Sequence, residues 1–502
     1  MPGIKTLELD PTKKNIYNTL VANAVGRNKN LWQFASFCSA QVSRCSIALD
    51  AEWGMGKTFF LKQLKMLFDL YDLDENEQRE IEKTFSKFRN KSAIVKKLKP
   101  HVCVYYDAWL NDNAEDPMQS ILYCLIKHKS DQFLKLSKYD EKSKKKIIAF
   151  LNDTKEFVKN LFLFNNKKDL LLEAIASFES CIPFKTKNIT ESAKTSNPTR
   201  GIEAQKSFHD AFSDYLNKLI PHKDERLLIL VDELDRCKPS YAVQLLERIK
   251  HYLSNDRITF VFAVNKDQLQ HTIRAFYGEA FDAYRYLNRF FYHNFILPSP
   301  DIENFMAFNG LDQTEKAFDF KLYADVCVSF IKLYDLSLRE AIRYWQWVSL
   351  ACHPFKNEKE RNDDISWKFV MYIIVPIIMG LRLCDKNELD EFLNGKKIDP
   401  LLAVLKNSPV GNSFIRHPEQ ALQEKRFDPE NMSSDILIPA EMIYTKLFDE
   451  DEFEKNRILD PLLYDTSPFE FNQKMREMIL SASNLMADFI KFDTNTEETA
   501  HG

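Results

Sequence analysis

The chain has 502 residues, of which 45% are hydrophobic and 28% charged, a composition that excludes a disordered or fibrous protein. Its 69 basic and 73 acidic residues give a net charge of −4, so no overall positive charge favours binding to nucleic acid or an anionic membrane. Because single hydrophobic cores stop growing at roughly 250–300 residues, the length favours at least two domains. Separately, the scarcity of glycine favours helices.

Apolar segments alternate with helical ones in the first part of the chain. Residues 15–42 have helical spacing, the strand "CSIALDA" follows, and helical spacing resumes at residue 57 after a glycine-containing turn. Further strands are predicted from three apolar runs, 101–109, 227–231 and 257–265. Strands that alternate with helices predict an α/β fold with a parallel sheet covered on both faces.

We expect the chain to divide into three parts. Residues 1–300 form the α/β domain, with a large, charged helical insertion at about 125–220. Residues 301–490 form a mainly helical domain, and 491–502 form a disordered tail. The longest apolar run, at 369–381, is too short to span a bilayer, so we expect a buried helix there.

The cysteines indicate the compartment. All nine are scattered singly, without a C-x-x-C pair or the spacing of a zinc site or a disulfide framework. Isolated cysteines in odd number are typical of a reducing compartment. The start, "MPGIKTLELDPTKKN", lacks the apolar core of a signal peptide, so we expect a cytoplasmic protein.

The stretch "DAEWGMGKTF" (50–59) lies between the first predicted strand and the next helix. Gly56, Lys57 and Thr58 match the end of the P-loop pattern G-x-x-x-x-G-K-[ST], whereas Ala51 replaces its first glycine. Strand, glycine loop and helix is the arrangement in which backbone N–H groups bind phosphate. We therefore expect Lys57 to neutralise phosphate oxygens and the loop to hold a nucleotide.

The run "LLILVDELD" supplies a second half of the predicted site. Asp232 and Glu233 follow a buried strand, and ligands of open α/β sheets bind beyond the carboxyl ends of the strands. We expect Asp232 and Thr58 to hold Mg²⁺, and Glu233 to orient or deprotonate the attacking water. The alternative is an ordinary helix start beside a solvent-facing acid pair.

These residues resemble the KAP family of P-loop NTPases, a branch of the STAND-like ATPases. "AEWGMGKT" is similar to the family's Walker A pattern G-x-W-G-x-G-K-[ST], including Trp53 and departing at Ala51. "YYDAWLNDNAEDPMQSIL" is similar to its aromatic N-A-W strand, and "VDELDRC" to its Walker B region. "ITFVFAVNKDQLQHTI" and "YRYLNRFFYHNFILP" extend the resemblance, which covers 16–300 with one long interruption.

The resemblance implies ATP and Mg²⁺ as cofactors. The nucleotide contacts it implies in the loop are Glu52, Trp53, Gly54, Met55, Gly56, Lys57, Thr58 and Phe59. Asn265 stands where the family has a polar sensor of hydrolysis, and the alternative is a cap at the end of the strand. Asp235 and Arg236 are expected to fix the turn after the strand rather than to touch nucleotide.

Three arginines are further catalytic candidates on the same resemblance. Arg289 stands at a commonly basic position and could act across an oligomer interface. Arg339 or Arg343, in "DLSLREAIRYW", could contact the γ-phosphate, and a solvated helix face is the alternative.

The resemblance also bears on partners. Many family members place transmembrane helices between the two halves of the site, whereas the insertion here is charged, so we expect it to bind a protein partner. We expect a nucleotide-dependent switch or assembly factor that controls a partner or its own oligomer, with bacterial phage defence as the suggested role. Two alternatives stay open: a nucleotide-binding scaffold without turnover, and an ATPase that depends on nucleic acid. Nucleic acid is not favoured, because the basic stretches 87–101 and 142–146 are more typical of solvated helices.

Overall fold

The computed structural model describes residues 10–88, 98, 101–135, 139–159, 169–184, 202–220, 222, 225–252, 255–311, 318–352, 365–417, 437–449, 451, 455, 475 and 479. They form two compact units. The α/β unit contains residues 10–23 and 27–299, and the helical unit contains 24–26 and the chain from 300 onward. The predicted tail, 491–502, lies outside the described residues, as does most of the basic stretch 87–101.

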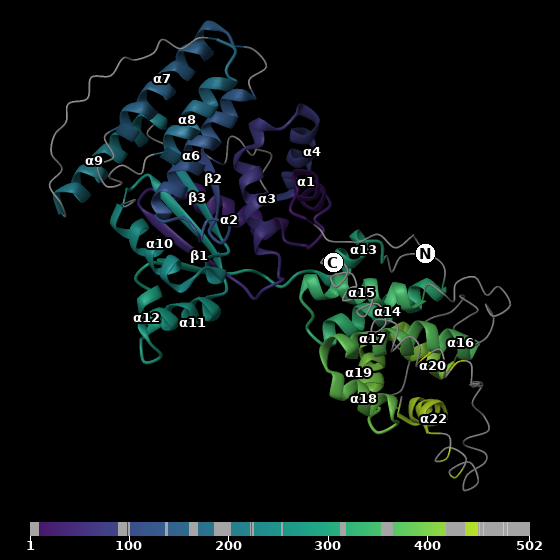
Figure 1. Cartoon of the computed structure of the whole chain (residues 1–502). Helices are drawn as coiled ribbons and strands as arrows, with labels where there is room; N and C mark the ends of the chain where they lie inside the picture. Colours follow the sequence, from purple (N-terminus) through teal and green to yellow (C-terminus); the bar gives the residue numbers. More distant parts are fainter. Residues whose placement is uncertain are drawn as a thin grey trace, which may run out of the picture. The chain divides into compact units, whose positions relative to one another are not determined.

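The α/β unit is built on one sheet of five parallel strands in the order β2-β3-β4-β1-β5 (Figure 1). The strands are β1 Cys45–Asp50, β2 His101–Asp107, β3 Arg226–Asp232, β4 Ile258–Val264 and β5 His293–Ile296. In the register of the sheet, Asp107 lies opposite Asp232, and Asp50 lies opposite Val264. The carboxyl ends of β1, β2, β3 and β4 therefore line one edge, and β4 separates β1 from β3. The predicted parallel α/β fold is confirmed.

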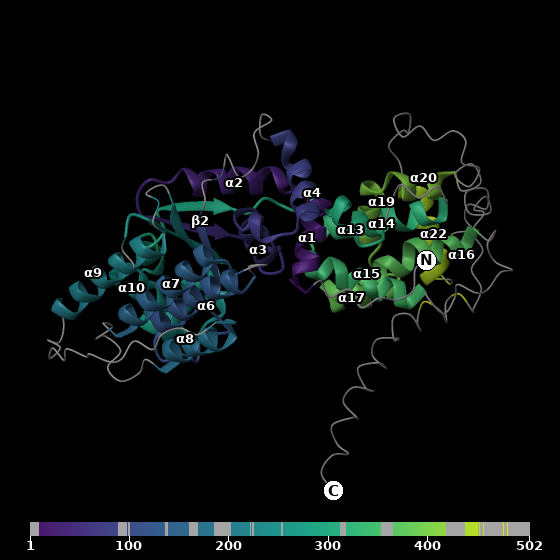
Figure 2. The ribbon, with the colours of Figure 1, turned by 90° about the horizontal axis from the view of Figure 1, so that it is seen from above.

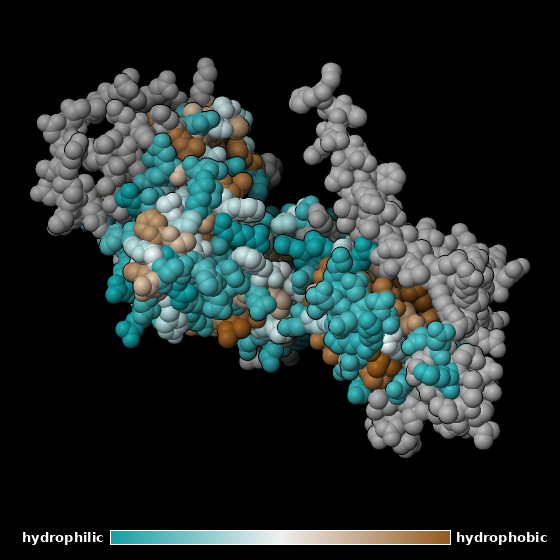
Figure 3. Space-filling view, turned by 60° about the horizontal axis from the view of Figure 1, so that its bottom comes forward, coloured by the Kyte–Doolittle hydropathy of each residue, from teal (hydrophilic) through white to brown (hydrophobic). Residues whose placement is uncertain are grey.

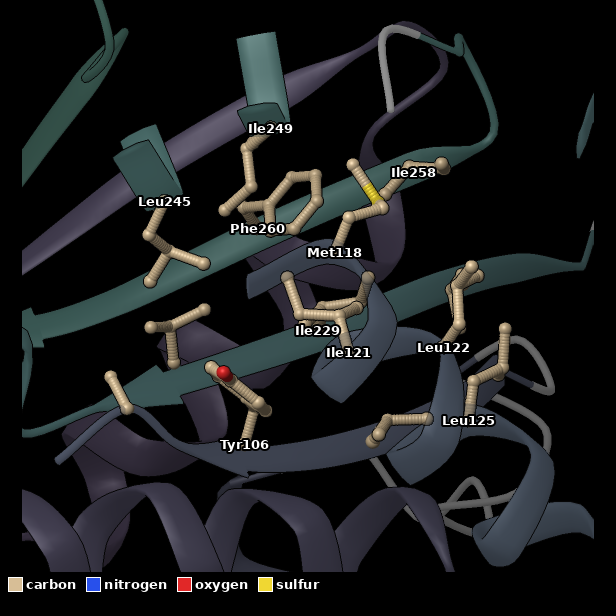
Figure 4. Close-up of a cluster of buried hydrophobic side chains, with 14 of the residues drawn as sticks. Tyr106, Met118, Ile121, Leu122, Leu125, Ile229, Leu245, Ile249, Ile258 and Phe260 are labelled. Carbon is tan, nitrogen blue, oxygen red and sulfur yellow. The ribbon is translucent and has the colours of Figure 1, made fainter. Parts of the chain in front are cut away.

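Alternate strand residues face opposite sides of this sheet, as the two-residue period of a strand requires. In β3, Leu227, Ile229 and Val231 belong to one hydrophobic core, and Leu228 and Leu230 to the other. Figure 4 shows the first core, where side chains of β2, β3 and β4 meet those of α6 and α10. Figure 2 shows α2 on the opposite side of the sheet from α6.

The helices of the α/β unit cover both faces. They are α1 Lys13–Val21, α2 Asn28–Ala40, α3 Lys57–Phe68, α4 Glu75–Phe85, α6 Pro117–Leu134, α7 Glu141–Lys159, α8 Asp169–Cys181, α9 Ile202–Leu219, α10 Pro239–Tyr252, α11 Lys266–Tyr277 and α12 Ala283–Leu287. Helices α6 to α9 contain the described part of the predicted insertion. Its core includes Phe157 and Tyr215, whose rings stack with centroids 4.4 Å apart.

The first helical segment is broken, which the apolar spacing of 15–42 did not predict. Helix α1 ends at Val21 and α2 begins at Asn28. Between them Asn23 and Gly26 have φ of 52° and 70°, in the left-handed region that interrupts a right-handed helix. The Asn28 side chain donates to the Leu20 carbonyl at 2.8 Å and fixes the turn.

The helical unit has its own core. Its helices are α13 Ile302–Phe308, α14 Phe318–Leu333, α15 Leu338–Cys352, α16 Ile365–Phe369, α17 Val375–Cys384, α18 Lys386–Leu393, α19 Asp399–Asn407, α20 Pro409–Arg416 and α22 Leu437–Phe448. A π-helical turn, Val370–Ile374, joins α16 to α17. It ends two residues before Pro376, whose missing N–H and bulky ring disturb a regular α-helical turn.

The predicted buried apolar helix is longer than its run of apolar residues. Among the described residues, Ile365–Cys384 is the one helix long and apolar enough to cross a membrane by length and composition, and 78% of its window is buried. That burial is typical of a core helix, and residues of this helix belong to the core of the helical unit. On the face shown in Figure 3, hydrophilic residues cover most of the described surface and hydrophobic ones form separate areas.

Candidate active site

The glycine loop, residues 51–56, joins β1 to α3 at the carboxyl edge of the sheet. Its start is held by a hydrogen bond from the Ala51 N–H to the Val264 carbonyl at 3.2 Å. Gly54 and Gly56 have φ of 81° and 85°, which residues with a Cβ adopt only at a cost. The two scarce glycines are therefore required by the path of the loop.

Helix α3 begins at this loop without a side-chain cap. Gly56 is its N-cap residue and supplies no side-chain hydrogen bond to the N–H groups of the first turn. Those N–H groups and the helix dipole favour an anion at this position. Phosphate is the anion that such helix starts bind after a glycine loop.

Lys57 is the first residue of α3, and its side chain returns to the loop. Its Nζ donates to the Ala51 carbonyl at 2.6 Å and to the Glu52 carbonyl at 2.9 Å. Burial lowers the pKa of Lys57, while the carboxylates of Asp235, Asp232 and Glu233 act in the opposite direction. The ammonium group thus lies within the electrostatic field of the acids at the end of β3 and just after it.

Asp232 ends β3 and is buried, with three donors around its carboxylate. Tyr105 donates its hydroxyl to Oδ2 at 2.9 Å, and the N–H of Glu233 donates to Oδ1 at 3.0 Å. The Thr58 side chain forms a further hydrogen bond with it. Burial raises the pKa of Asp232, and these three hydrogen bonds lower it. The structure therefore brings the two predicted metal ligands together.

Glu233 follows in a left-handed conformation, with φ of 60°. Such a conformation is uncommon for a residue other than glycine and often occurs at functional sites. Its carboxylate forms an ion pair with Arg236. Burial and the charge of Asp232 raise the pKa of Glu233, and Arg236 lowers it.

Several contacts at the site were missed in the sequence because they join distant segments. The Trp53 indole donates to Asp235 Oδ2 at 2.6 Å, and Asp50 Oδ1 accepts the N–H of Lys266 at 2.9 Å. Buried Arg27 donates from Nη1 to the Met55 carbonyl at 2.7 Å, and burial lowers the pKa of its guanidinium to about 10. Its Nε and Nη2 atoms are buried without a hydrogen-bond partner among the described residues.

The remaining loop residues predicted to contact nucleotide differ in exposure. Glu52 and Trp53 are exposed, whereas Met55 and Phe59 are partly buried. Phe59 lies at the edge of the hydrophobic core beneath α3.

Asn265 follows β4, between the ends of β1 and β3. Its Oδ1 accepts the N–H groups of Asp267 and Gln268, both at 3.2 Å, so it is the N-cap of α11. The contacts of Asn265 are therefore those of a cap, and a sensor role stays a prediction.

None of the site contacts described above involves the three candidate arginines. Arg289 is exposed shortly after α12, as a residue acting across an oligomer interface would be. Arg339 and Arg343 are exposed on α15, which belongs to the helical unit. The roles of all three stay predictions.

Comparison with protein families shows the family to which the chain belongs. The model of the KAP family P-loop domain matches residues 14–350, more than half of the chain. The chain belongs to the KAP family of P-loop NTPases. The matched range continues past Pro300 and takes in α13, α14 and most of α15. No curated protein sequence matched the chain.

The donor set of this KAP protein fits nucleotide and a hard divalent cation. The uncapped start of α3 and Lys57 suit phosphate, and Thr58 beside Asp232 offers the oxygen ligands that Mg²⁺ prefers. No three His, Cys, Asp or Glu side chains are grouped as a metal site within the described part of the chain. Mg²⁺ is usually bound through one or two protein oxygens, water and substrate phosphates.

Proposed function

We propose that this KAP protein binds ATP with Mg²⁺ and hydrolyses it, and that its nucleotide state controls a protein partner or its own oligomer. The arrangement of Lys57 and Thr58 at the start of α3, beside Asp232 and Glu233 at the end of β3, carries this proposal. Bound Mg²⁺ would neutralise charge on the transferring phosphoryl group.

We assign each residue of the site a role in binding or hydrolysis that is consistent with its contacts. The N–H groups of the loop and Lys57 bind the phosphates, and Thr58 and Asp232 hold the cation. Glu233 orients the attacking water and accepts its proton, since it is an acid one residue beyond the cation ligand. Tyr105 keeps the Asp232 carboxylate in place through the hydrogen bond at 2.9 Å.

The purified protein tests this directly. Mg²⁺-dependent phosphate release is measured for wild type, Lys57→Ala and Glu233→Gln, with the exposed surface changes Lys29→Ala and Glu279→Gln as controls. We expect both site variants to lose turnover and both controls to keep it.

Nucleotide binding is measured separately by melting temperature. ATP at about 100 times its Kd stabilises the folded protein by about 2.7 kcal/mol. We expect this stabilisation in wild type and in Glu233→Gln, and its loss in Lys57→Ala. Stabilisation without turnover in wild type would instead support a nucleotide-binding scaffold. An equal response in wild type and Lys57→Ala would contradict the site.

The switch role is supported by the size of the helical insertion, which adds α7, α8 and α9 to the sheet and its covering helices. We assign this insertion to partner binding and the helical unit to a lid or partner-docking role. The nine cysteines are scattered singly along the chain, which supports a cytoplasmic location. Phage defence is tested by plaque counts on bacteria that carry wild type or Lys57→Ala, and equal counts would contradict it.

A further inference from the structure

Arg236 connects the Glu233 carboxylate to two tryptophans from other segments. Its Nε forms an ion pair with Glu233. Its Cζ lies over both indole rings, 6.0 Å from the centroid of Trp53 and 5.6 Å from that of Trp109. Guanidinium groups at this distance are attracted by the negative faces of aromatic rings. We call Trp53, Arg236 and Trp109 the arginine clamp.

The Trp53 ring and the backbone beside Trp109 are held by hydrogen bonds that do not involve Arg236. The Trp53 indole donates to Asp235, one residue before Arg236. Trp109 follows Ala108, whose N–H donates to the Asp232 carbonyl at 3.0 Å and extends the pairing of β2 with β3. The rings remain 46% and 52% exposed, so burial alone does not account for their placement beside the guanidinium.

The Glu233 carboxylate depends on a basic partner for its orientation. Its backbone is fixed, because its N–H is bonded to Asp232 and its carbonyl accepts the Arg236 N–H at 3.1 Å. Its carboxylate, however, stands at the end of a flexible side chain. Arg236 is the one basic residue that forms an ion pair with it among the described residues. The direction of the carboxylate therefore depends on where the guanidinium is held.

We propose that Arg236 is the positioning residue for Glu233, and that Trp53 and Trp109 hold its guanidinium in the orientation that directs this carboxylate at the attacking water. The inference rests on the proposed function. It predicts that the planar guanidinium is required, because an ammonium group at the same place has neither its face nor its fixed donor geometry. Since Trp53 belongs to the glycine loop, the clamp also makes the position of Glu233 depend on that loop.

Steady-state kinetics of the full chain test the clamp. The variants are Arg236→Lys, Arg236→Gln, Trp109→Phe and Trp109→Ala, together with the double change Arg236→Gln with Trp109→Ala. The matched control is Arg285→Gln, since Arg285 forms the same kind of pair with an acid three residues earlier, at 3.3 Å, but is 85% exposed.

We expect both Arg236 variants to lower kcat by roughly 10–100-fold, because a displacement of about 1 Å in a reacting group can cost 10²-fold. The KM for ATP and the stabilisation by ATP should stay near wild type. Trp109→Phe, which keeps an aromatic face, should retain most of the activity that Trp109→Ala loses. The double variant should be no worse than Arg236→Gln alone, because both changes disable one unit.

Three results would overturn the inference. Arg236→Lys with the kcat of wild type would show that the guanidinium is not required. Losses that multiply in the double variant would show that Trp109 does not act through Arg236. Loss of ATP stabilisation in parallel with kcat would assign Arg236 to the fold of the turn. Absence of turnover in wild type refutes the proposed function itself, so the two proposals fail in different measurements.

Discussion

Replacing Tyr105 by Phe removes one hydroxyl from the proposed metal site and leaves the ring in place. The hydroxyl donates to Asp232 Oδ2 at 2.9 Å, and Lys62 Nζ lies 4.8 Å from the centroid of the ring, a contact that Phe preserves. Burial and the nearby Asp232 charge raise the pKa of Tyr105, so the phenol stays a donor at neutral pH. The change therefore removes one charge-assisted hydrogen bond from a buried carboxylate.

The size of the effect follows from the kind of bond. Hydrogen bonds to charged groups contribute about 1.5–3 kcal/mol, and each 1.4 kcal/mol is a factor of ten in binding. Loss of a group that orients a metal ligand typically costs about 10–100-fold in metal affinity. We expect Tyr105→Phe to raise the Mg²⁺ concentration for half-maximal turnover by at least about tenfold, by the same principle.

The assay is a titration of ATP turnover with Mg²⁺ at fixed free ATP. At saturating Mg²⁺ the KM for ATP should return to that of wild type, because the loop and Lys57 are unchanged. Tyr71→Phe is the control, since Tyr71 is 67% exposed. An unchanged Mg²⁺ dependence in Tyr105→Phe would refute the assignment of Asp232 as the cation ligand held by Tyr105.

Three further predictions concern the loop, the helical core and a buried histidine. Gly54→Ala and Gly56→Ala should weaken ATP binding in thermal-shift titrations, since a Cβ in the left-handed region costs about 1–2 kcal/mol; unchanged ATP stabilisation would contradict the required loop path. Gly380→Ala should lower the urea midpoint by the equivalent of about 1–3 kcal/mol, because its Cβ would overlap the Phe330 ring, and Phe330→Leu in the same chain should restore part of the loss. Burial, with Lys65 nearby, lowers the pKa of His128 to about 3, so below pH 6.5 the unfolded chain binds a proton that the folded chain does not. Stability should therefore decrease as the pH is lowered through this window. Between pH 7 and 5.5, wild type should lose about 1 kcal/mol more of its free energy of unfolding than His128→Gln. Equal losses in the two proteins, measured by urea denaturation, would refute this.

The strands and the glycine loop could be predicted because their signals are local. Continuous apolar runs such as 227–231 mark buried strands, and a pair of glycines before Lys57 is rare in a chain that has 11 glycines in all. The order of the strands was not accessible in this way. The register that places Asp107 opposite Asp232 joins residues far apart in the chain, and nothing local in the sequence specifies it.

The contacts that complete the site were missed for the same reason. Tyr105 and Asp232 are separated by 127 positions, and Trp53 and Asp235 by 182. Each of these residues also has an ordinary local explanation, as a strand residue, a loop aromatic or a turn acid. The break after α1 was missed because apolar spacing continues across it, and its local signals were Asn23 and Gly26.

Single-turnover hydrolysis of prebound ATP by wild type and Glu233→Gln tests the central claim most directly, because it separates chemistry from binding and from product release. The account predicts that both proteins bind Mg²⁺ and ATP alike, and that only wild type converts the bound ATP within the time of one catalytic cycle. Equal rates of conversion in the two proteins would contradict it, because Glu233 would then have no part in the chemistry.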